Sequence, residues 1–156
     1  MKITLLLLGK TSLKPVAELM EVYANKIKHY TSFEVAVIDN SAIRSEQPEA
    51  VKEAEAKLIL KKIQPSDSVV LLDENGKTFD SIGFSNQLQA WQNAGKKHIV
   101  FIVGGAFGFH ETVYKRAEMK ISLSLMTFSH QIIRPVFMEQ LYRGFSILKN
   151  EPYHHR

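Results

Sequence analysis

Short apolar runs alternate with amphipathic segments of helical period along the whole 156-residue chain. The runs are rich in leucine, valine and isoleucine, which predicts strands that are covered on both faces. Such strands are expected at 2–8, 33–38, 69–72, 98–103 and 121–125. Helices are expected at about 16–30, 49–63, 111–117 and 132–149, with one more that carries Phe84, Leu88 and Trp91 and ends at Gly95. This alternation implies an α/β fold, a parallel sheet with helices on both faces, in a single domain spanning 1–156.

Two loops near the end of the chain follow neighbouring strands. Residues 104–108 contain three glycines, which let the backbone come close to a ligand, and residues 126–130 follow the run 121–125. Because parallel strands end at the same edge of a sheet, the loops predict a ligand crevice there, to which Leu72 and Asp73 can add backbone contacts. Taken alone, the glycine loop is as consistent with a simple turn at a strand end as with a cofactor loop.

Several chemistries are excluded by what the sequence lacks. The spacing Gly-Gly-X-X-Gly differs from the dinucleotide-binding fingerprint, and no lysine follows as in a phosphate-binding loop. The chain has no cysteine, and its histidines and carboxylates do not have metal-ligand spacing, so no metal is expected. The apolar run 3–8 is too short for a signal peptide or a membrane span. We therefore expect a cytoplasmic protein without membrane contact.

The C-terminal segment concentrates positive charge. The chain has a formal net charge of +4, and residues 134–156 carry four basic residues against Glu139 and Glu151. This pattern favours a polyanionic partner such as RNA, although a solubilising surface explains it about equally well. The tail that follows Pro152 is expected to leave the last helix, with Tyr153 available for stacking on a base.

The last predicted helix allows two interpretations at each of its notable positions. His130 stands at its entrance, where a capping or packing histidine is more common than a catalytic one. Arg134 lies one turn further on and would project from the same region. An apolar stripe along the helix suits either core packing or a dimer interface, and it consists of Ile133, Phe137, Leu141, Gly144, Phe145 and Leu148.

Four motifs occur in order over the second half of the chain. They are Val103-Gly104-Gly105 with Gly108, Met126-Thr127-Phe128 with His130, Glu139-Gln140-Leu141-Tyr142-Arg143, and Pro152-Tyr153-His154. With these motifs the sequence resembles, over its whole length, the ribosomal RNA large subunit methyltransferase H family of SPOUT methyltransferases. Ser129 and Pro135 depart from the proline and valine that are usual in that family.

The resemblance implies a C-terminal trefoil knot, a homodimer and S-adenosyl-L-methionine as the methyl donor. It also implies that the substrate is a pseudouridine in helix 69 of large-subunit (23S) ribosomal RNA, methylated at ring nitrogen 3, in the assembled ribosome. The donor would bind to Leu72, Gly104, Leu123, Ser124, Leu125, Met126, Thr127 and Phe128.

The chemistry of the transfer suggests roles for the remaining motif residues. Histidine is a suitable proton acceptor near neutral pH, arginine binds phosphates, and tyrosine stacks on unpaired bases. The expected catalytic residues are His130, Arg134, Arg143, Tyr153 and His154, and the expected RNA-binding residues are Arg134, Arg143, Tyr153, His154 and Arg156. The alternatives are a non-catalytic RNA-binding domain and a nucleotide-cofactor oxidoreductase of the open α/β type.

Overall fold

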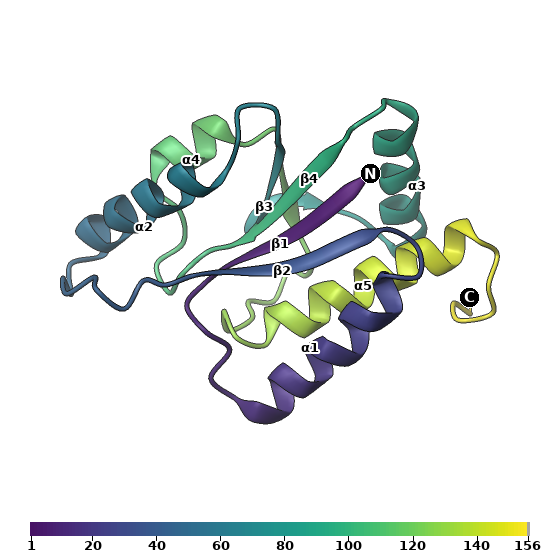
Figure 1. The fold of residues 1–156 in the computed structure, drawn as a ribbon, viewed down its shortest axis with the longest axis horizontal. Helices are drawn as coiled ribbons and strands as arrows, with labels where there is room; N and C mark the ends of the chain where they lie inside the picture. The colour runs from purple at the N-terminus through teal and green to yellow at the C-terminus, as the bar shows by residue number, and fades with distance from the viewer. Residues whose placement is uncertain (156) are drawn as a thin grey trace.

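A five-stranded parallel sheet forms the centre of the molecule in a computed structural model, which describes residues 1–155 (Figure 1). The strands are β1 (Lys2–Leu8), β2 (Ser32–Ile38), β3 (Ser68–Thr78), β4 (His98–Val103) and β5 (Met119–Ser122). The helices are α1 (Lys14–Ile27), α2 (Pro48–Lys62), α3 (Ser81–Asn93), α4 (Glu111–Arg116) and α5 (Ile133–Leu148). The strand order is β2-β1-β4-β3-β5, and every adjacent pair is parallel. The predicted α/β class is confirmed, whereas the trefoil knot stays a prediction.

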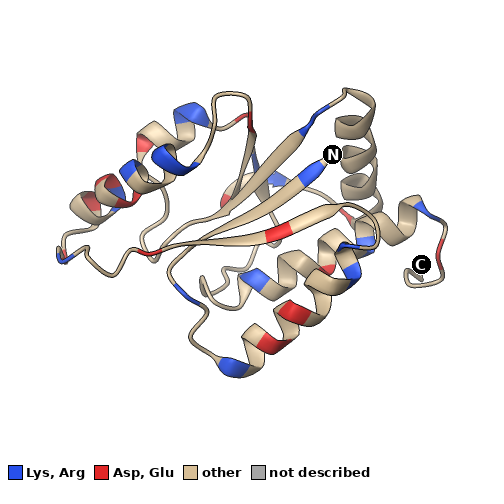
Figure 2. Cartoon of the chain, viewed as in Figure 1, with Lys and Arg blue, Asp and Glu red and all other residues tan. Residues whose placement is uncertain are grey.

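The two faces of the sheet are covered by different helices. Leu5 and Leu7 of β1 pack into a core shared with α1, α3 and α5, and the alternate residues Leu6 and Leu8 pack into a core shared with α2 and α4. This follows from the two-residue period of a strand, which sends successive side chains to opposite faces. Charged residues accordingly lie mainly on the helices and loops (Figure 2).

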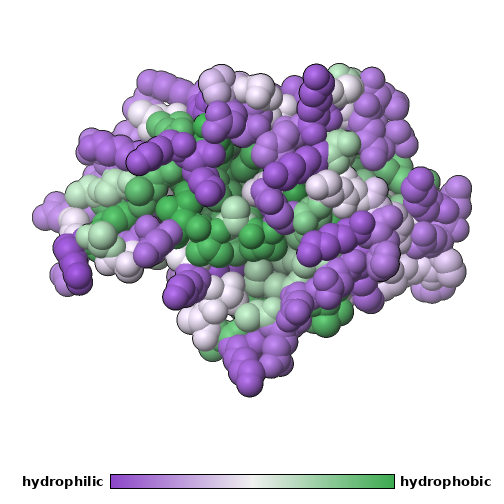
Figure 3. Space-filling model, viewed as in Figure 1, coloured by the Kyte–Doolittle hydropathy of each residue, from purple (hydrophilic) through white to green (hydrophobic). Residues whose placement is uncertain are grey.

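Strand β2 is one of the two edge strands of the sheet, and β5 is the other. Strand β2 pairs only with β1. Hydrophobic side chains gather over this edge, where Val37 is 45% exposed (Figure 3). No helix within residues 1–155 is both long and apolar enough to cross a membrane.

Two predicted boundaries at the β3–β5 pair are wrong. The run 121–125 is not all strand, because β5 ends at Ser122. There the Ser122 hydroxyl donates to the Ser124 carbonyl, and the Met126 N–H donates to the Ser124 hydroxyl, so local bonds replace strand pairing. Conversely, β3 extends beyond residue 72: both Leu72 and Lys77 pair with Ile121, so residues 73–76 form a bulge.

The bulge depends on glycine at position 76. A Cβ at Gly76 would lie 2.5 Å from the backbone nitrogen of Ile121, so any larger residue must displace β5. We expect Gly76→Ala to reduce the free energy of unfolding by about 1–3 kcal/mol, as overpacked substitutions do. Urea denaturation measures this, with Lys77→Ala at the neighbouring exposed position as the control. Equal stability of the two variants would contradict the close packing at Gly76.

Candidate ligand-binding site

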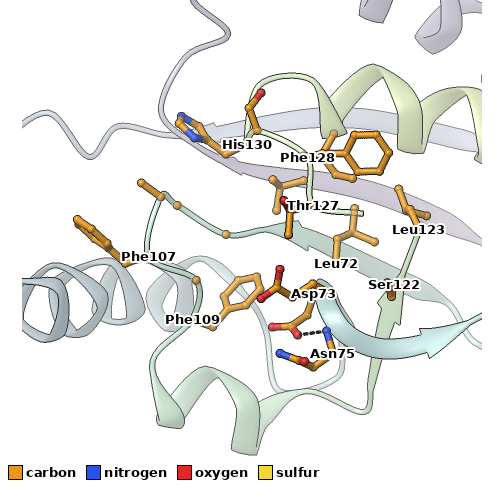
Figure 4. Close-up of a pocket in the computed structure, with 18 of the residues that line it drawn as sticks. Leu72, Asp73, Asn75, Phe107, Phe109, Ser122, Leu123, Thr127, Phe128 and His130 are labelled. Atoms are coloured by element: carbon orange, nitrogen blue, oxygen red, sulfur yellow. Dashed lines mark hydrogen bonds between the residues drawn. The ribbon is translucent and has the colours of Figure 1, made fainter. Parts of the chain in front are cut away.

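A cavity of about 650 Å³ opens at the carboxyl ends of β3, β4 and β5 (Figure 4). Its walls are formed by the bulge within β3 after Leu72, by the glycine loop 104–109 that follows β4, and by the loop 123–130 that follows β5. Its volume lies within the range of small-molecule and cofactor sites. The predicted crevice at this edge of the sheet therefore exists as a cavity in the folded chain.

The glycine loop turns back on itself beside the cavity. Gly105 and Gly108 form an isolated antiparallel bridge, with the Gly108 N–H donating to the Gly105 carbonyl at 3.2 Å. Gly108 has a φ of +80°, which favours glycine. A Cβ at Gly104 would lie 3.2 Å from the ring of Phe109, so this position tolerates little added volume. These contacts hold the loop backbone at the cavity wall.

The loop after β5 leads directly into α5. The Ser129 hydroxyl accepts from the Ile132 N–H at 3.1 Å in the turn before α5, and the side chain of His130 does not cap the helix, whose N-cap residue is Ile132. The side chain of His130 is exposed, lines the cavity and makes no hydrogen bond within residues 1–155. His130 is therefore available to a ligand.

Seven of the eight residues expected to bind the donor line this one cavity. They are Leu72, Gly104, Leu123, Ser124, Met126, Thr127 and Phe128. Leu125 does not line it and is 93% exposed. The expected contact of Leu125 with the donor is therefore not supported, because the turn after Ser124 directs its side chain to solvent.

The cavity also contains side chains that sequence analysis did not identify. Phe107 and Phe109 stand on the glycine loop, Lys52 comes from α2, and Tyr114 of α4 donates a hydrogen bond to Asp73. Burial, together with the bond to Asp73, raises the pKa of Tyr114 to about 12, so its hydroxyl remains a donor at neutral pH. Lys52 and Tyr114 stand on helices, outside the loops whose motifs were identified, so no motif signals their contribution.

The whole chain matches known proteins. A family profile described as "Predicted SPOUT methyltransferase" matches residues 1–154. The chain belongs to this SPOUT family. Proteins named "Ribosomal RNA large subunit methyltransferase H" from Flavobacterium johnsoniae and Christiangramia forsetii are 50% and 51% identical to it over 157 residues, covering 100% of each chain. The protein of that name from Parabacteroides distasonis is 50% identical and covers 99% of both chains.

Arg134 has a structural position that differs from the predicted one at the ligand site. Arg134 is fully buried, and its guanidinium donates to the carbonyl oxygens of His130, Gly9 and Leu8 and to the hydroxyl of Thr11. Burial lowers the pKa of this guanidinium. A fully buried guanidinium that makes four hydrogen bonds inside the protein does not reach an RNA phosphate. The prediction that Arg134 is a catalytic and RNA-binding residue is therefore wrong, and its role is structural.

The tail packs against the far end of α5. Asn150 has a φ of +54° and turns the chain back after the helix. The Tyr153 hydroxyl donates to Glu139 at 2.9 Å, and its ring lies 4.6 Å from that of Tyr142 and 4.9 Å from the Arg143 guanidinium. The tail therefore leaves the helix as predicted but packs along its side.

Arg143 and His154 belong to the same cluster. Arg143 bonds to Glu139, which raises the pKa of the guanidinium, and its Nη1 lies 3.5 Å from Nδ1 of His154. Burial and the hydrogen bonds to Tyr23 and Glu139 raise the pKa of Tyr153, so its hydroxyl is neutral. Arg156 lies outside the described residues.

The loop 123–130, which lines the cavity, leads into the first turn of α5, and the tail follows the other end of the helix (Figure 1). The helix has 16 residues and is therefore about 24 Å long, at 1.5 Å per residue. His130 is at its cavity end, whereas Arg143, Tyr153 and His154 are at or near its other end. The structure therefore does not bring all the predicted site residues together within one chain.

The structural role of Arg134 has a measurable consequence. We expect Arg134→Met to lower the free energy of unfolding by at least about 3 kcal/mol, because it leaves several buried carbonyl oxygens without a donor. Chemical denaturation measures the change, and Lys149→Met, at an exposed position just after α5, should stay within about 0.5 kcal/mol of wild type. An unchanged free energy of unfolding in Arg134→Met would show that the buried hydrogen bonds of Arg134 contribute little to stability.

Proposed function

We propose that this protein is an S-adenosyl-L-methionine-dependent methyltransferase that modifies ring nitrogen 3 of a pseudouridine in helix 69 of 23S ribosomal RNA. The observation that carries the proposal is the single cavity into which Leu72, Gly104 and most of the 123–128 loop converge. Membership of the SPOUT methyltransferase family supports the reaction class, and the names of the relatives support ribosomal RNA as substrate. We further propose that residues 1–156 act as one SPOUT domain on assembled ribosomes in the cytoplasm.

The cavity suits the donor in size and chemistry. Close backbone approach at Gly104 and the free ends of three parallel strands provide N–H and C=O groups for an adenine and a ribose. Phe107, Phe109 and Phe128 provide aromatic surface, which attracts a cation such as a sulfonium. Bound there, the donor would supply an electrophilic methyl group.

The protein must hold the base in line with that methyl group and remove the proton from its nitrogen. Holding two reactants in a reactive geometry can supply about 7–11 kcal/mol of barrier reduction in favourable cases, so we assign positioning the main role. His130 is exposed at the cavity and free of internal hydrogen bonds, which makes it one proton acceptor; His154 is the other.

We propose that the active form is a homodimer in which one copy supplies the cavity and its partner supplies the tail. Support comes from the position of Tyr153 and His154, which contact Glu139 and Arg143 along α5 and do not line the cavity of their own chain. Helix α1 packs beside α5 and exposes Leu19 and Val22, which gives apolar surface for association. In such a dimer Arg143, Tyr153, His154 and Arg156 would bind the RNA next to the donor.

Donor binding and methyl transfer test the proposed reaction. Calorimetric titration should detect S-adenosyl-L-methionine binding, and mass spectrometry of ribosomal RNA should detect N3-methylpseudouridine after incubation. Gly104→Val should weaken donor binding at least about tenfold, since its side chain meets Phe109 at the cavity wall. Ala90→Val, at an exposed position on α3 outside the cavity, is the control. A wild-type protein that binds RNA but no donor would instead be a non-catalytic RNA-binding domain.

Mixing two inactive variants tests the shared site. Gly104→Val lacks a working cavity, and truncation after Asn150 lacks the tail but should keep the fold, as circular dichroism can verify. Each alone should lose methylation, whereas a refolded equimolar mixture should recover about a quarter of wild-type activity, because half the dimers are mixed and each has one intact site. No recovery, with light scattering showing dimers, would mean that each tail serves its own chain.

A further inference from the structure

Glu55 is a buried acid that the proposed reaction does not use. It lies in the middle of α2 and is 5% exposed. Its Oε1 accepts a hydrogen bond from Nδ2 of Asn40 at 3.3 Å. Its Oε2 is the one buried side-chain nitrogen or oxygen without a hydrogen-bond partner within residues 1–155. An unpaired buried carboxyl group costs folding free energy, so its presence needs a reason other than packing.

The carboxyl group lies directly against the glycine loop. A Cβ at Gly105 would be 2.6 Å from Oε1 and 2.7 Å from Oε2. Gly105 lines the cavity, whereas Glu55 does not. Glu55 therefore supports the loop from behind and has no contact with a ligand in the cavity.

Few other contacts define the shape of this loop. Its one internal backbone bond joins the Gly108 N–H to the Gly105 carbonyl, and Ala106 and Phe107 at its tip are exposed. The neighbouring Gly104 abuts the ring of Phe109. The position of Gly105, which forms part of the cavity wall, thus depends on the carboxyl group of Glu55.

The surroundings of Glu55 favour its neutral form. Burial raises the pKa of the carboxyl group, and the Asn40 amide opposes this. Asp39 after β2, Lys52 on α2 and His110 after the loop are titratable groups on the adjoining elements, and none of them contributes to the shift. A neutral carboxyl group offers an O–H to a peptide carbonyl oxygen, which a carboxylate cannot do.

We propose that Glu55 is a positioning residue, whose buried carboxyl group holds the 104–108 loop in the shape that donor binding requires. This inference rests on the proposed function, because the ligand is S-adenosyl-L-methionine. In this proposal α2 supports the glycine loop from the side opposite the cavity, whereas the loops that follow the strands contact the donor directly. The neutral form is the competent one, so donor affinity should fall as pH rises through the pKa of Glu55.

Calorimetric titration of the full-length protein with S-adenosyl-L-methionine, between about pH 5.5 and pH 9, tests the inference. Glu55→Gln keeps the volume, the contact with Asn40 and an N–H donor, but it does not titrate. We expect it to match wild type at the acidic end and to bind at least about fivefold more tightly than wild type at the basic end. Glu53→Gln, at an exposed position on the same helix, is the control and should follow wild type throughout.

Glu55→Ala removes the support and should weaken donor binding at least about tenfold at every pH. If this variant does not fold, the pH dependence of donor affinity in wild type and in Glu55→Gln still tests the role of Glu55. Identical pH profiles of those two proteins, or wild-type affinity in folded Glu55→Ala, would overturn the role of Glu55 and leave the proposed function standing. A wild type that binds no donor at any pH would overturn both.

Discussion

The guanidinium of Arg134 joins parts of the chain that are more than 120 residues apart. Its donors connect the carbonyl oxygens at the end of β1 with the carbonyl of His130 at the entrance of α5. The acceptors are neutral, so the buried charge is stabilised by hydrogen bonds alone. Through these bonds the last loop is fixed against the edge of the sheet, and the position of His130 at the cavity follows from them.

The parallel sheet explains why the loops that wall the cavity meet at one edge of the sheet. All five strands run in one direction, so the segments that leave β3, β4 and β5 emerge side by side. The core residues that cover both faces make the strand ends rigid, while the loops beyond them remain accessible to a ligand. The bulge at 73–76 adds Asp73 to the wall, and α4 supplies Tyr114 as its partner.

Charged and aromatic groups of the C-terminal region form a second unit, remote from the cavity. Glu139 receives bonds from Arg143 and Tyr153, and the rings of Tyr142 and Tyr153 pack at a steep angle. This arrangement holds the tail on α5 and presents it as a preformed surface. The proposed partner copy would join this surface to a cavity, so association and catalysis would depend on the same helix.

The sequence by itself determined the order of strands and helices along the chain, because short apolar runs and amphipathic stripes of period 3.6 are local properties. It also identified the glycine loop and the 123–128 loop, since their motifs are contiguous. It did not reveal that Leu125 faces solvent, because the early end of β5 is set by the hydrogen bonds of Ser122 and Ser124. Only the tertiary structure decided that Arg134 is buried and anchors the last loop, that Glu55 lies against Gly105, and that Tyr153 packs on α5 and not in the cavity. The reason is that burial, and contact between residues remote in sequence, arise from the packing of whole elements and leave no local pattern.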